Sequence, residues 1–326
     1  MFLVCSNRVE VLHAQLAQLL HDTPLRDPFQ AEVILVPGSA MERWVNLHLG
    51  MAHGVAANID YPLPAAWIWS LAAAVNTQSK QGGEDPLSRD RAAWRLFALL
   101  PDLLDQPEFV QLQHYLRDDA QGVKRWQLAQ RLADVYDRYQ YYRPDWIRAW
   151  SEGRSTDSMR SAELAPWQGP LWRALIHDCP DNHRVALIDK LLAALQSPSE
   201  QTRVLAMLPE RIICFALSSL PPLFVQVLQA LSAHLNIYLF QHSPTDQYWA
   251  DLRSKKALAR TRLTNPEEAN YYETGNELLA SWGRQGQAFQ DLLLSEDSLN
   301  AVHLEEYADP GSVMLLHRVQ RDILTL

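Results

Sequence analysis

The chain has 326 residues, of which 48% are hydrophobic and 21% charged, and its formal net charge is −9 at pH 7. This length predicts about two domains, and the apolar content is enough for a sizeable core. The acidic charge argues against a freestanding protein that coats DNA electrostatically, so any contact with nucleic acid must be local.

The sequence contains no sign of a membrane segment or of a secretory leader. No apolar run approaches the ~20 residues of a membrane span, and the first residues lack the basic and apolar regions of a signal peptide. We therefore expect a cytoplasmic protein without a membrane partner. Three widely spaced cysteines, Cys5, Cys179 and Cys214, indicate neither a disulfide framework nor a zinc knuckle, so each is expected to be a small buried residue.

The chain begins with a pattern of alternating strands and helices. Residues 2–5 predict a strand, and Ser6 and Asn7 can cap a helix with apolar residues at Val9, Leu12, Leu16, Leu19 and Leu20. Prolines at 24 and 28 break the chain before an apolar run at 33–36. The resulting β-α-β-α order predicts an α/β fold with a parallel sheet, whose ligands would lie beyond the carboxyl ends of the strands.

The stretch 32–44 predicts a strand, a turn and a helix in the arrangement of a phosphate loop. Pro37 and Gly38 form the turn, and Ser39 stands at the expected N-cap of the helix. Nucleotide-binding loops of this kind end in Gly-Lys-Ser/Thr, and no lysine is present here. Ser39 and Arg43 could bind a phosphate through the helix N-terminus, or they could simply cap and solvate the helix, which is the commoner case.

The next segment is extended and then helical. Pro62 and Pro64 exclude helix and hold the chain extended, and a helix resumes through residues 67–72. Leu63 and Trp69 are either packing residues or apolar wedges against bases. Residues 77–85 predict a linker, and from Pro86 to about Cys179 the pattern is almost wholly helical, with one helix ending at Leu100-Pro101 and a loop at 151–156.

The helix around Asp134 carries the most informative polar face. Asp134, Asp137, Arg138 and Tyr141 recur at helical spacing, opposite a predicted apolar stripe of Leu128, Leu132, Val135 and Tyr139. An exposed Asp134–Arg138 pair worth ~0.3–0.5 kcal/mol is the simpler interpretation. The alternative is a groove for single-stranded DNA, because aromatic residues here are interleaved with arginines, although most of the rings are expected to lie in the core.

Beyond residue 182 the β-α-β order returns. Residues 211–215 and 237–240 predict strands on either side of a helix over 224–231. An ATPase would place acidic metal ligands just after the first of these strands, but Ala216, Leu217 and Ser218 stand there. We therefore predict a discontinuous α/β domain of residues 1–83 and 182–326 with a helical insert at 84–181. The histidines are scattered, without the spacing of a metal or nucleophile motif, and no catalytic residue, metal or cofactor is predicted.

Several sequence blocks resemble the amino-terminal part of the RecC family, the gamma chains of exodeoxyribonuclease V, the RecBCD helicase-nuclease. The resemblance extends from the first residues to Asp322-Ile323-Leu324. Its blocks are Ser6-Asn7-Arg8, Ile34-Leu35-Val36 with Met41 and Trp44, residues 56–64, Tyr142-Arg143-Pro144-Asp145-Trp146, residues 216–222 and Leu279-Ala280-Ser281-Trp282-Gly283. Members of the family are much longer, so the resemblance implies an amino-terminal fragment.

The resemblance implies a superfamily-one helicase fold without ATPase activity, in a non-catalytic subunit that serves DNA double-strand-break repair and recombination. Such a subunit holds RecB-like and RecD-like motors together, channels single-stranded DNA and scans the 3′-ending strand for the Chi sequence. Carried over by position, the Chi-reading residues would be Pro37, Ser39, Arg43, Leu63, Trp69, Asp134, Val135, Asp137, Arg138, Arg143 and Arg184.

Three of these positions depart from the family pattern, because Pro37, Arg43 and Arg138 stand where glutamines are familiar. Proline has no side-chain donor, so the recognised sequence is expected to differ from the best-known Chi. Two further hypotheses remain open from the sequence: a nucleotide hydrolase with an unfamiliar phosphate loop, and a helical protein-interaction scaffold without DNA contact.

Overall fold

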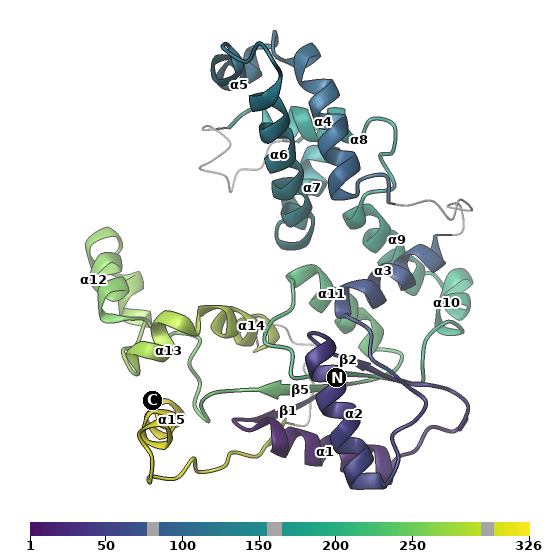
Figure 1. Ribbon diagram of the computed structural model, residues 1–326, viewed down its shortest axis with the longest axis vertical. Helices are drawn as coiled ribbons and strands as arrows, with labels where there is room; N and C mark the ends of the chain where they lie inside the picture. The colour runs from purple at the N-terminus through teal and green to yellow at the C-terminus, as the bar shows by residue number, and fades with distance from the viewer. Residues whose placement is uncertain (77–84, 155–164, 295–302) are drawn as a thin grey trace. The chain divides into compact units, whose positions relative to one another are not determined.

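The computed structural model describes residues 1–76, 85–154, 165–294 and 303–326 (Figure 1). Most of the predicted linker at 77–85 and the end of the predicted loop at 151–156 lie outside these residues. The chain divides into a first unit of Met1–Ile68, Leu205–Leu220 and Phe224–Leu326 and a second unit of Trp69–Val204 and Pro221–Leu223. The predicted domain boundaries, at 83/84 and 181/182, differ from the bounds of these two units. The predicted domains stay a proposal.

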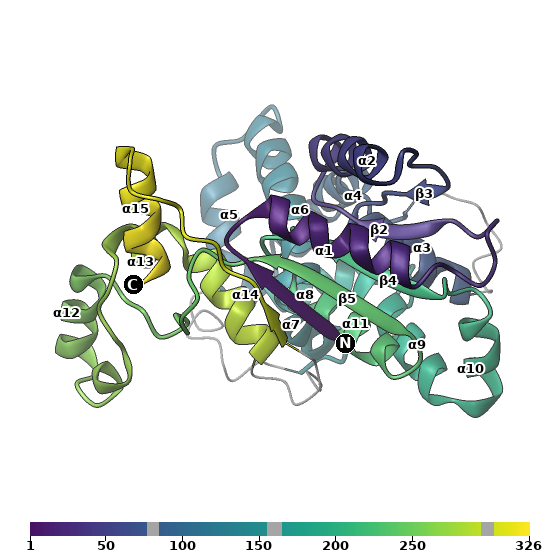
Figure 2. The same ribbon diagram turned by 90° about the horizontal axis from the view of Figure 1, so that it is seen from below.

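The first unit is built on a parallel sheet, which confirms the predicted α/β class. Within the described residues the sheet has six strands in the order β3-β2-β4-β5-β1-β6, and every pairing is parallel. The two shortest strands were not predicted, because two or three residues carry no readable alternation. The strands are β1 (Phe2–Ser6), β2 (Glu32–Leu35), β3 (Ile59–Asp60), β4 (Arg211–Phe215), β5 (Asn236–His242) and β6 (His303–Glu305). Figure 2 shows β1 and β5 side by side.

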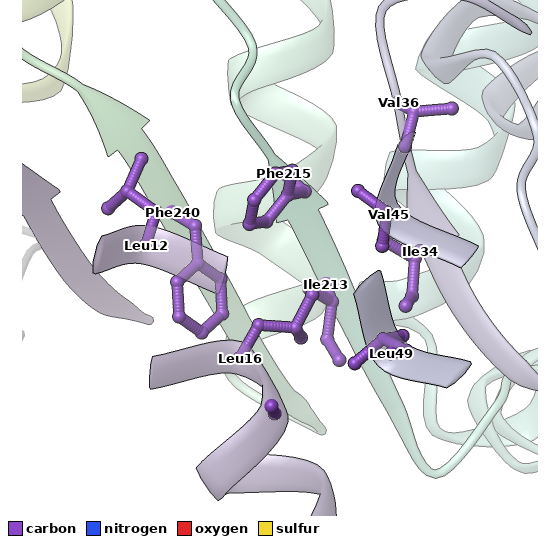
Figure 3. Packing of buried hydrophobic residues seen from close by; sticks show 10 residues of the cluster. Leu12, Leu16, Ile34, Val36, Val45, Leu49, Ile213, Phe215 and Phe240 are labelled. Carbon is purple, nitrogen blue, oxygen red and sulfur yellow. The ribbon is translucent and has the colours of Figure 1, made fainter. Parts of the chain in front are cut away.

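Two helices pack their apolar stripes against this sheet. Leu12 and Leu16 come from α1 (Val9–Asp22), and Val45 and Leu49 come from α2 (Ser39–His53). Figure 3 shows these side chains gathered with residues of β2, β4 and β5, all of them buried in one cluster. This burial fixes the direction in which α2 leaves β2, and so it sets the position of the turn between them.

A buried ion pair holds the opposite end of β2. The Arg211 guanidinium donates two hydrogen bonds of 2.7 Å to the Glu32 carboxylate and one of 2.6 Å to the Thr23 carbonyl. The side chains of Arg211 and Glu32 are only 7% and 10% exposed. The planar guanidinium satisfies both carboxylate oxygens, which is the geometry that makes such a buried pair tolerable.

The remaining helices of the first unit follow the sheet strands in the chain. They are α11 (Pro222–Ser232, whose first two residues belong to the second unit), α12 (Lys255–Thr264), α13 (Glu277–Trp282), α14 (Arg284–Leu294) and α15 (Leu315–Leu324), with a 3₁₀ turn at Glu268–Tyr271. No helix in the described ranges is both long and apolar enough to cross a lipid bilayer.

The second unit is helical throughout its described residues, as the pattern from Pro86 to Cys179 predicts. Its helices are α3 (Pro64–Val75, which starts in the first unit), α4 (Arg89–Leu103), α5 (Val110–Leu116), α6 (Val123–Tyr142), α7 (Pro144–Ser151), α8 (Gln168–Ile176), α9 (Arg184–Gln196) and α10 (Pro198–Leu205, whose last residue belongs to the first unit), with a 3₁₀ turn at Pro107–Phe109. The predicted helix end at Leu100-Pro101 is wrong, because α4 continues to Leu103 with Pro101 inside it. Pro101 lacks the amide that would donate to the carbonyl four residues earlier, so the helix loses one backbone hydrogen bond there and ends two residues later.

The predicted apolar stripe of α6 is rotated from the face that is actually buried. The buried residues are Ala129, Leu132, Ala133, Tyr136 and Gln140, whereas Leu128, Val135 and Tyr139 are only partly covered. The predicted stripe consists of large side chains. The structure also buries Ala129 and Ala133, because small side chains let neighbouring helices approach closely. The rotation places Asp134 and Asp137 at the border of the buried face, where both are half-buried.

Candidate nucleic-acid interface

The turn between β2 and α2 has a backbone N-cap instead of the predicted serine cap. Gly38 is the N-cap residue, and its carbonyl accepts from the amides of Met41 and Glu42, both at 3.1 Å. Ser39 is already the first helical residue and makes no capping hydrogen bond. The predicted cap at Ser39 is therefore wrong, because extended backbone at Gly38 starts the helix one residue earlier.

The predicted cap of α1 by Ser6 or Asn7 is also wrong. Arg8 is the N-cap residue of α1, without a side-chain capping bond. The Ser6 hydroxyl instead accepts from the Arg8 amide at 3.1 Å, and the Asn7 side chain exchanges two hydrogen bonds with the backbone of Ala308. These polar residues close the turn after β1 and connect it to a segment 301 residues further along the chain.

The β2–α2 turn presents its predicted site residues to solvent. Pro37, Ser39 and Arg43 are exposed, and no carboxylate in the described part of the chain forms an ion pair with Arg43. The Val36 amide donates to the Pro62 carbonyl at 3.3 Å, which holds the segment with Leu63 against the end of β2. Leu63 is 49% exposed. These four predicted residues therefore form one exposed group in the first unit.

The strand ends next to this turn offer no phosphate-binding lysine and no metal-binding carboxylate. Ala216 follows β4 in a left-handed conformation with φ of 51°, and its amide donates to the Phe240 carbonyl at 2.8 Å. Leu217 and Ser218 come next. Among the described residues, no cluster of three or more His, Cys, Asp or Glu side chains could hold a metal ion.

The second group of predicted residues centres on Arg184, the first residue of α9. Its Nη1 atom donates to the Asp137 carboxylate at 2.5 Å and to the Tyr141 hydroxyl at 2.6 Å, and Nη2 donates to Asp85 at 3.5 Å. The guanidinium carbon lies 5.0 Å from the ring centroid of Tyr141 and 5.5 Å from that of Trp69. Two carboxylates and two aromatic rings thus hold one arginine in a fixed orientation.

Buried neighbours set the position of Arg184. Its backbone amide donates to the buried Gln140 side chain of α6 at 2.9 Å. His183 caps α9, with Nδ1 accepting from the Ala186 amide at 3.2 Å. Burial lowers the pKa of His183 to about 4, which keeps the ring neutral and able to accept this bond near neutral pH.

Asp134 has a different partner from the one that the sequence predicts. It forms an ion pair with Arg89 of α4, whereas Arg138 is exposed and has no carboxylate within ion-pair distance among the described residues. The predicted Asp134–Arg138 pair is therefore wrong, because the rotated register of α6 turns Asp134 towards α4. Val135 is half-buried.

Arg143 ends α6 beside an aromatic ring. Its side chain is exposed, and its guanidinium carbon lies 5.1 Å from the ring centroid of Trp146. The structure thus places Trp69, Asp134, Val135, Asp137, Arg138, Arg143 and Arg184 in the second unit and Pro37, Ser39, Arg43 and Leu63 in the first. Sequence reasoning missed Asp85 and Arg89 as partners, because they lie 99 and 45 residues from the side chains that they contact and no local spacing connects them.

Comparison with known proteins adds the family. A family model described as "RecC, N-terminal domain" matches residues 1–326. A protein of Escherichia coli (strain K12) named "RecBCD enzyme subunit RecC" is 34% identical over 348 residues, which cover 98% of this chain and 30% of that protein. A protein with the same name from Haemophilus influenzae (strain ATCC 51907 / DSM 11121 / KW20 / Rd) is 31% identical over 379 residues, covering 100% of this chain and 33% of the relative.

A more distant relative, with the same name, comes from Mycolicibacterium smegmatis (strain ATCC 700084 / mc(2)155). It is 30% identical over 326 residues, covering 98% of this chain and 27% of the relative. The chain thus spans between about a quarter and a third of the length of these relatives, and it matches the amino-terminal family model from end to end. The predicted family is confirmed: the chain belongs to the RecC family, whose amino-terminal domain it matches along its whole length.

Proposed function

We propose that this chain is the amino-terminal region of a non-catalytic subunit of a RecBCD-type helicase-nuclease, which acts in DNA double-strand-break repair and recombination. It guides single-stranded DNA and recognises the Chi sequence on the 3′-ending strand. The names of the relatives support its membership in such a complex, with RecB-like and RecD-like subunits as partners. The observation that carries the DNA contact is the cluster in which Arg184 lies between two carboxylates and the rings of Trp69 and Tyr141.

The chemistry of this cluster suits bases better than phosphates. Carboxylates repel the DNA backbone, so Asp85 and Asp137 lower non-specific affinity in a chain that is already acidic. A carboxylate can, however, accept from the exocyclic amino group of a base, and an arginine can donate to the acceptor edge of guanine. Each good contact of this kind discriminates against the wrong base by ~1–3 kcal/mol. The cluster therefore fits recognition of a sequence.

The aromatic rings supply the second component of the binding. Trp69 and Tyr141 lie edge to face, with ring centroids 5.8 Å apart. An ordered aromatic pair provides a stacking surface for an unpaired base, at ~1–3 kcal/mol per stacked base. Arg143 beside Trp146 offers the same combination of a cation and a ring at the end of α6.

The first unit fits a superfamily-one helicase scaffold that does not hydrolyse ATP. The β2–α2 turn keeps the strand-turn-helix geometry of a phosphate loop, but it has no lysine for a nucleotide, and no carboxylate follows β4 for a magnesium ion. We propose that its ligand is a passing DNA strand, which Ser39, Arg43 and Leu63 contact. In this proposal residues 1–83 and 182–326 form the helicase-like domain and 84–181 a helical insert.

Three site positions point to an altered recognition sequence. Pro37 has no side-chain donor, and Arg43 and Arg138 are cations where the family pattern has glutamine. Glutamine pairs best with adenine, whereas arginine pairs best with guanine. We therefore propose that the sequence read by this protein differs from the best-known Chi at the bases that face these side chains.

The test uses the full-length subunit assembled with its partner subunits. Asp137→Ala and Arg143→Ala should weaken the response to the Chi sequence and leave DNA unwinding largely intact, because both are proposed recognition residues. Arg117→Ala is the matched control, since Arg117 is an exposed arginine of the second unit that lies outside α6. A normal Chi response in both purified variants would reject the proposal.

A further inference from the structure

An exposed aromatic cluster joins α4 and α6 away from the Arg184 cluster. Trp94 of α4 is 61% exposed, and its ring centroid lies 4.2 Å from that of Trp126 of α6 at an interplanar angle of 39°. The Phe97 ring packs edge-on against both, at 6.1 Å and 5.7 Å. Packing with Trp126 and Phe97 covers only part of the Trp94 indole, so an apolar ring stays in water.

A cation without an acidic partner lies beside this cluster. The guanidinium carbon of Arg125 lies 4.0 Å from the ring centroid of Phe97, and its buried Nε atom has no acceptor among the described residues. No carboxylate in the described ranges forms an ion pair with Arg125. The nearby Asp119 is occupied, since it accepts from the backbone amides of Lys124 and Arg125 at 3.1 Å and 2.7 Å.

The cluster lies on the same face of α6 as the proposed recognition residues. This face is a stripe with helical spacings of four, four, three and four residues, formed by Trp126, Gln130, Asp134, Asp137 and Tyr141. At 1.5 Å per residue the stripe is about 22 Å long. A cavity of about 300 Å³ lies between the aromatic cluster and the Arg89–Asp134 pair, lined by Ser88, Arg89, Asp90, Ala93 and Gln130.

We propose that Trp94 and Trp126 form a base-stacking platform for single-stranded DNA, so that the strand follows the α6 stripe from Trp94 to Trp69. This rests on the proposed function. An exposed ring, a guanidinium that no carboxylate neutralises and a polar cavity alongside suit a polyanion with stacking bases. Asp90 is the one acidic side chain among the residues that line the cavity.

The experiment probes the assembled complex with single-stranded oligonucleotides that carry 5-iodouracil at successive positions. Crosslinks to α4 and the start of α6 should fall about 5- to 150-fold in Trp94→Ala, which is ~1–3 kcal/mol for one stacked base. Trp94→Phe keeps a ring and should retain most of the crosslinks. Trp282→Ala is the matched control, because Trp282 is 85% exposed but belongs to the first unit.

The possible outcomes separate this proposal from the proposed function. Unchanged crosslinks in Trp94→Ala would overturn the platform, and so would weaker co-purification of the partner subunits with unchanged crosslinks, which would assign Trp94 to a protein contact. If Asp137→Ala still changes the Chi response in these cases, only the platform fails. If no strand crosslinks to the second unit and the Chi response of Asp137→Ala is normal, both proposals fail.

Discussion

The β2–α2 turn and the α6 face both carry predicted DNA-contacting residues, but they hold them in opposite ways. At the turn, Pro37, Ser39 and Arg43 are exposed, and Arg43 has no ion-pair partner among the described residues. On α6, Asp137 is braced by Arg184, which also contacts Tyr141 and Asp85. The turn therefore offers exposed side chains without an ion-pair partner among the described residues, whereas the α6 face offers side chains that are already held by an arginine.

The difference implies a different energetic balance for each region. A base that binds Asp137 or Asp134 must compete with an arginine that already occupies the carboxylate. A base that binds the carboxylate weakly does not displace the arginine, so the competition favours the correct base. At the turn, the N–H groups at the start of α2 and the Arg43 side chain can donate to any phosphate without breaking an ion pair. We infer that α6 contributes specificity and that the turn contributes affinity.

The largest expected effect comes from the buried Arg211–Glu32 pair, at the end of β2 opposite the turn. Arg211→Ala should lower the free energy of unfolding of the first unit by ~3–5 kcal/mol, because it leaves the buried Glu32 carboxylate without its partner. Chemical denaturation followed by tryptophan fluorescence measures the change. The double change Glu32→Leu with Arg211→Met should restore much of the loss, since it removes both buried charges. A loss below 1 kcal/mol in Arg211→Ala would contradict a structural role for this pair.

The second prediction is that the stability of the second unit depends on pH through His183. His183 has a folded-state pKa of about 4, against 6.5 ordinarily, because of its burial, while Asp189 and Asp181 oppose the shift and Lys190 and Arg148 reinforce it. The unfolded state therefore binds the proton more readily. Stability is full above pH 6.5 and falls as the pH drops from 6.5 towards 4, by up to about 3 kcal/mol.

Urea unfolding at pH 7.0, 5.5 and 4.5 checks this prediction. His183→Asn is the control, because asparagine can still cap α9 but does not titrate. The variant should lose less stability on acidification than the unchanged protein. Equal losses in both proteins would show that other groups cause the acid sensitivity. His13 of α1, whose pKa burial also lowers, is the counterpart in the first unit.

A smaller effect is expected when the brace on α6 is removed. Arg184→Ala should cost ~1.5–3 kcal/mol, because it breaks charged hydrogen bonds that are only partly shielded from water. Asp85→Asn should cost less, since its contact with Arg184 is the longest, at 3.5 Å. Thermal unfolding measures both. A greater loss from Asp85→Asn than from Arg184→Ala would mean that Asp85 has another essential role.

The elements of the fold follow largely from the sequence, and the side-chain pairs do not. Local spacing predicts the parallel sheet, the turn at Pro37 and the helical character of the second unit, because each depends on neighbours along the chain. The partners of Asp134 and Arg184 could not be predicted in this way, since Arg89 and Asp85 come from distant elements. Small alanines on α6 also hid its true buried face and hence which way Asp134 points.

The smallest effect on stability, and the sharpest test of the comparison, is expected at the turn. Arg43→Ala should change the free energy of unfolding by no more than ~0.5 kcal/mol, because an exposed side chain without an ion-pair partner in the described chain stabilises little. In the assembled complex it should still weaken binding to single-stranded DNA and reduce the slope of log affinity against log salt by ~0.7, the value for one lost phosphate contact. Arg26→Ala is the control, since Arg26 is another exposed arginine of the same unit and lies away from the turn, beside Glu210. An unchanged slope in Arg43→Ala would remove the turn from the path of the strand and leave the proposed contacts on α4 and α6.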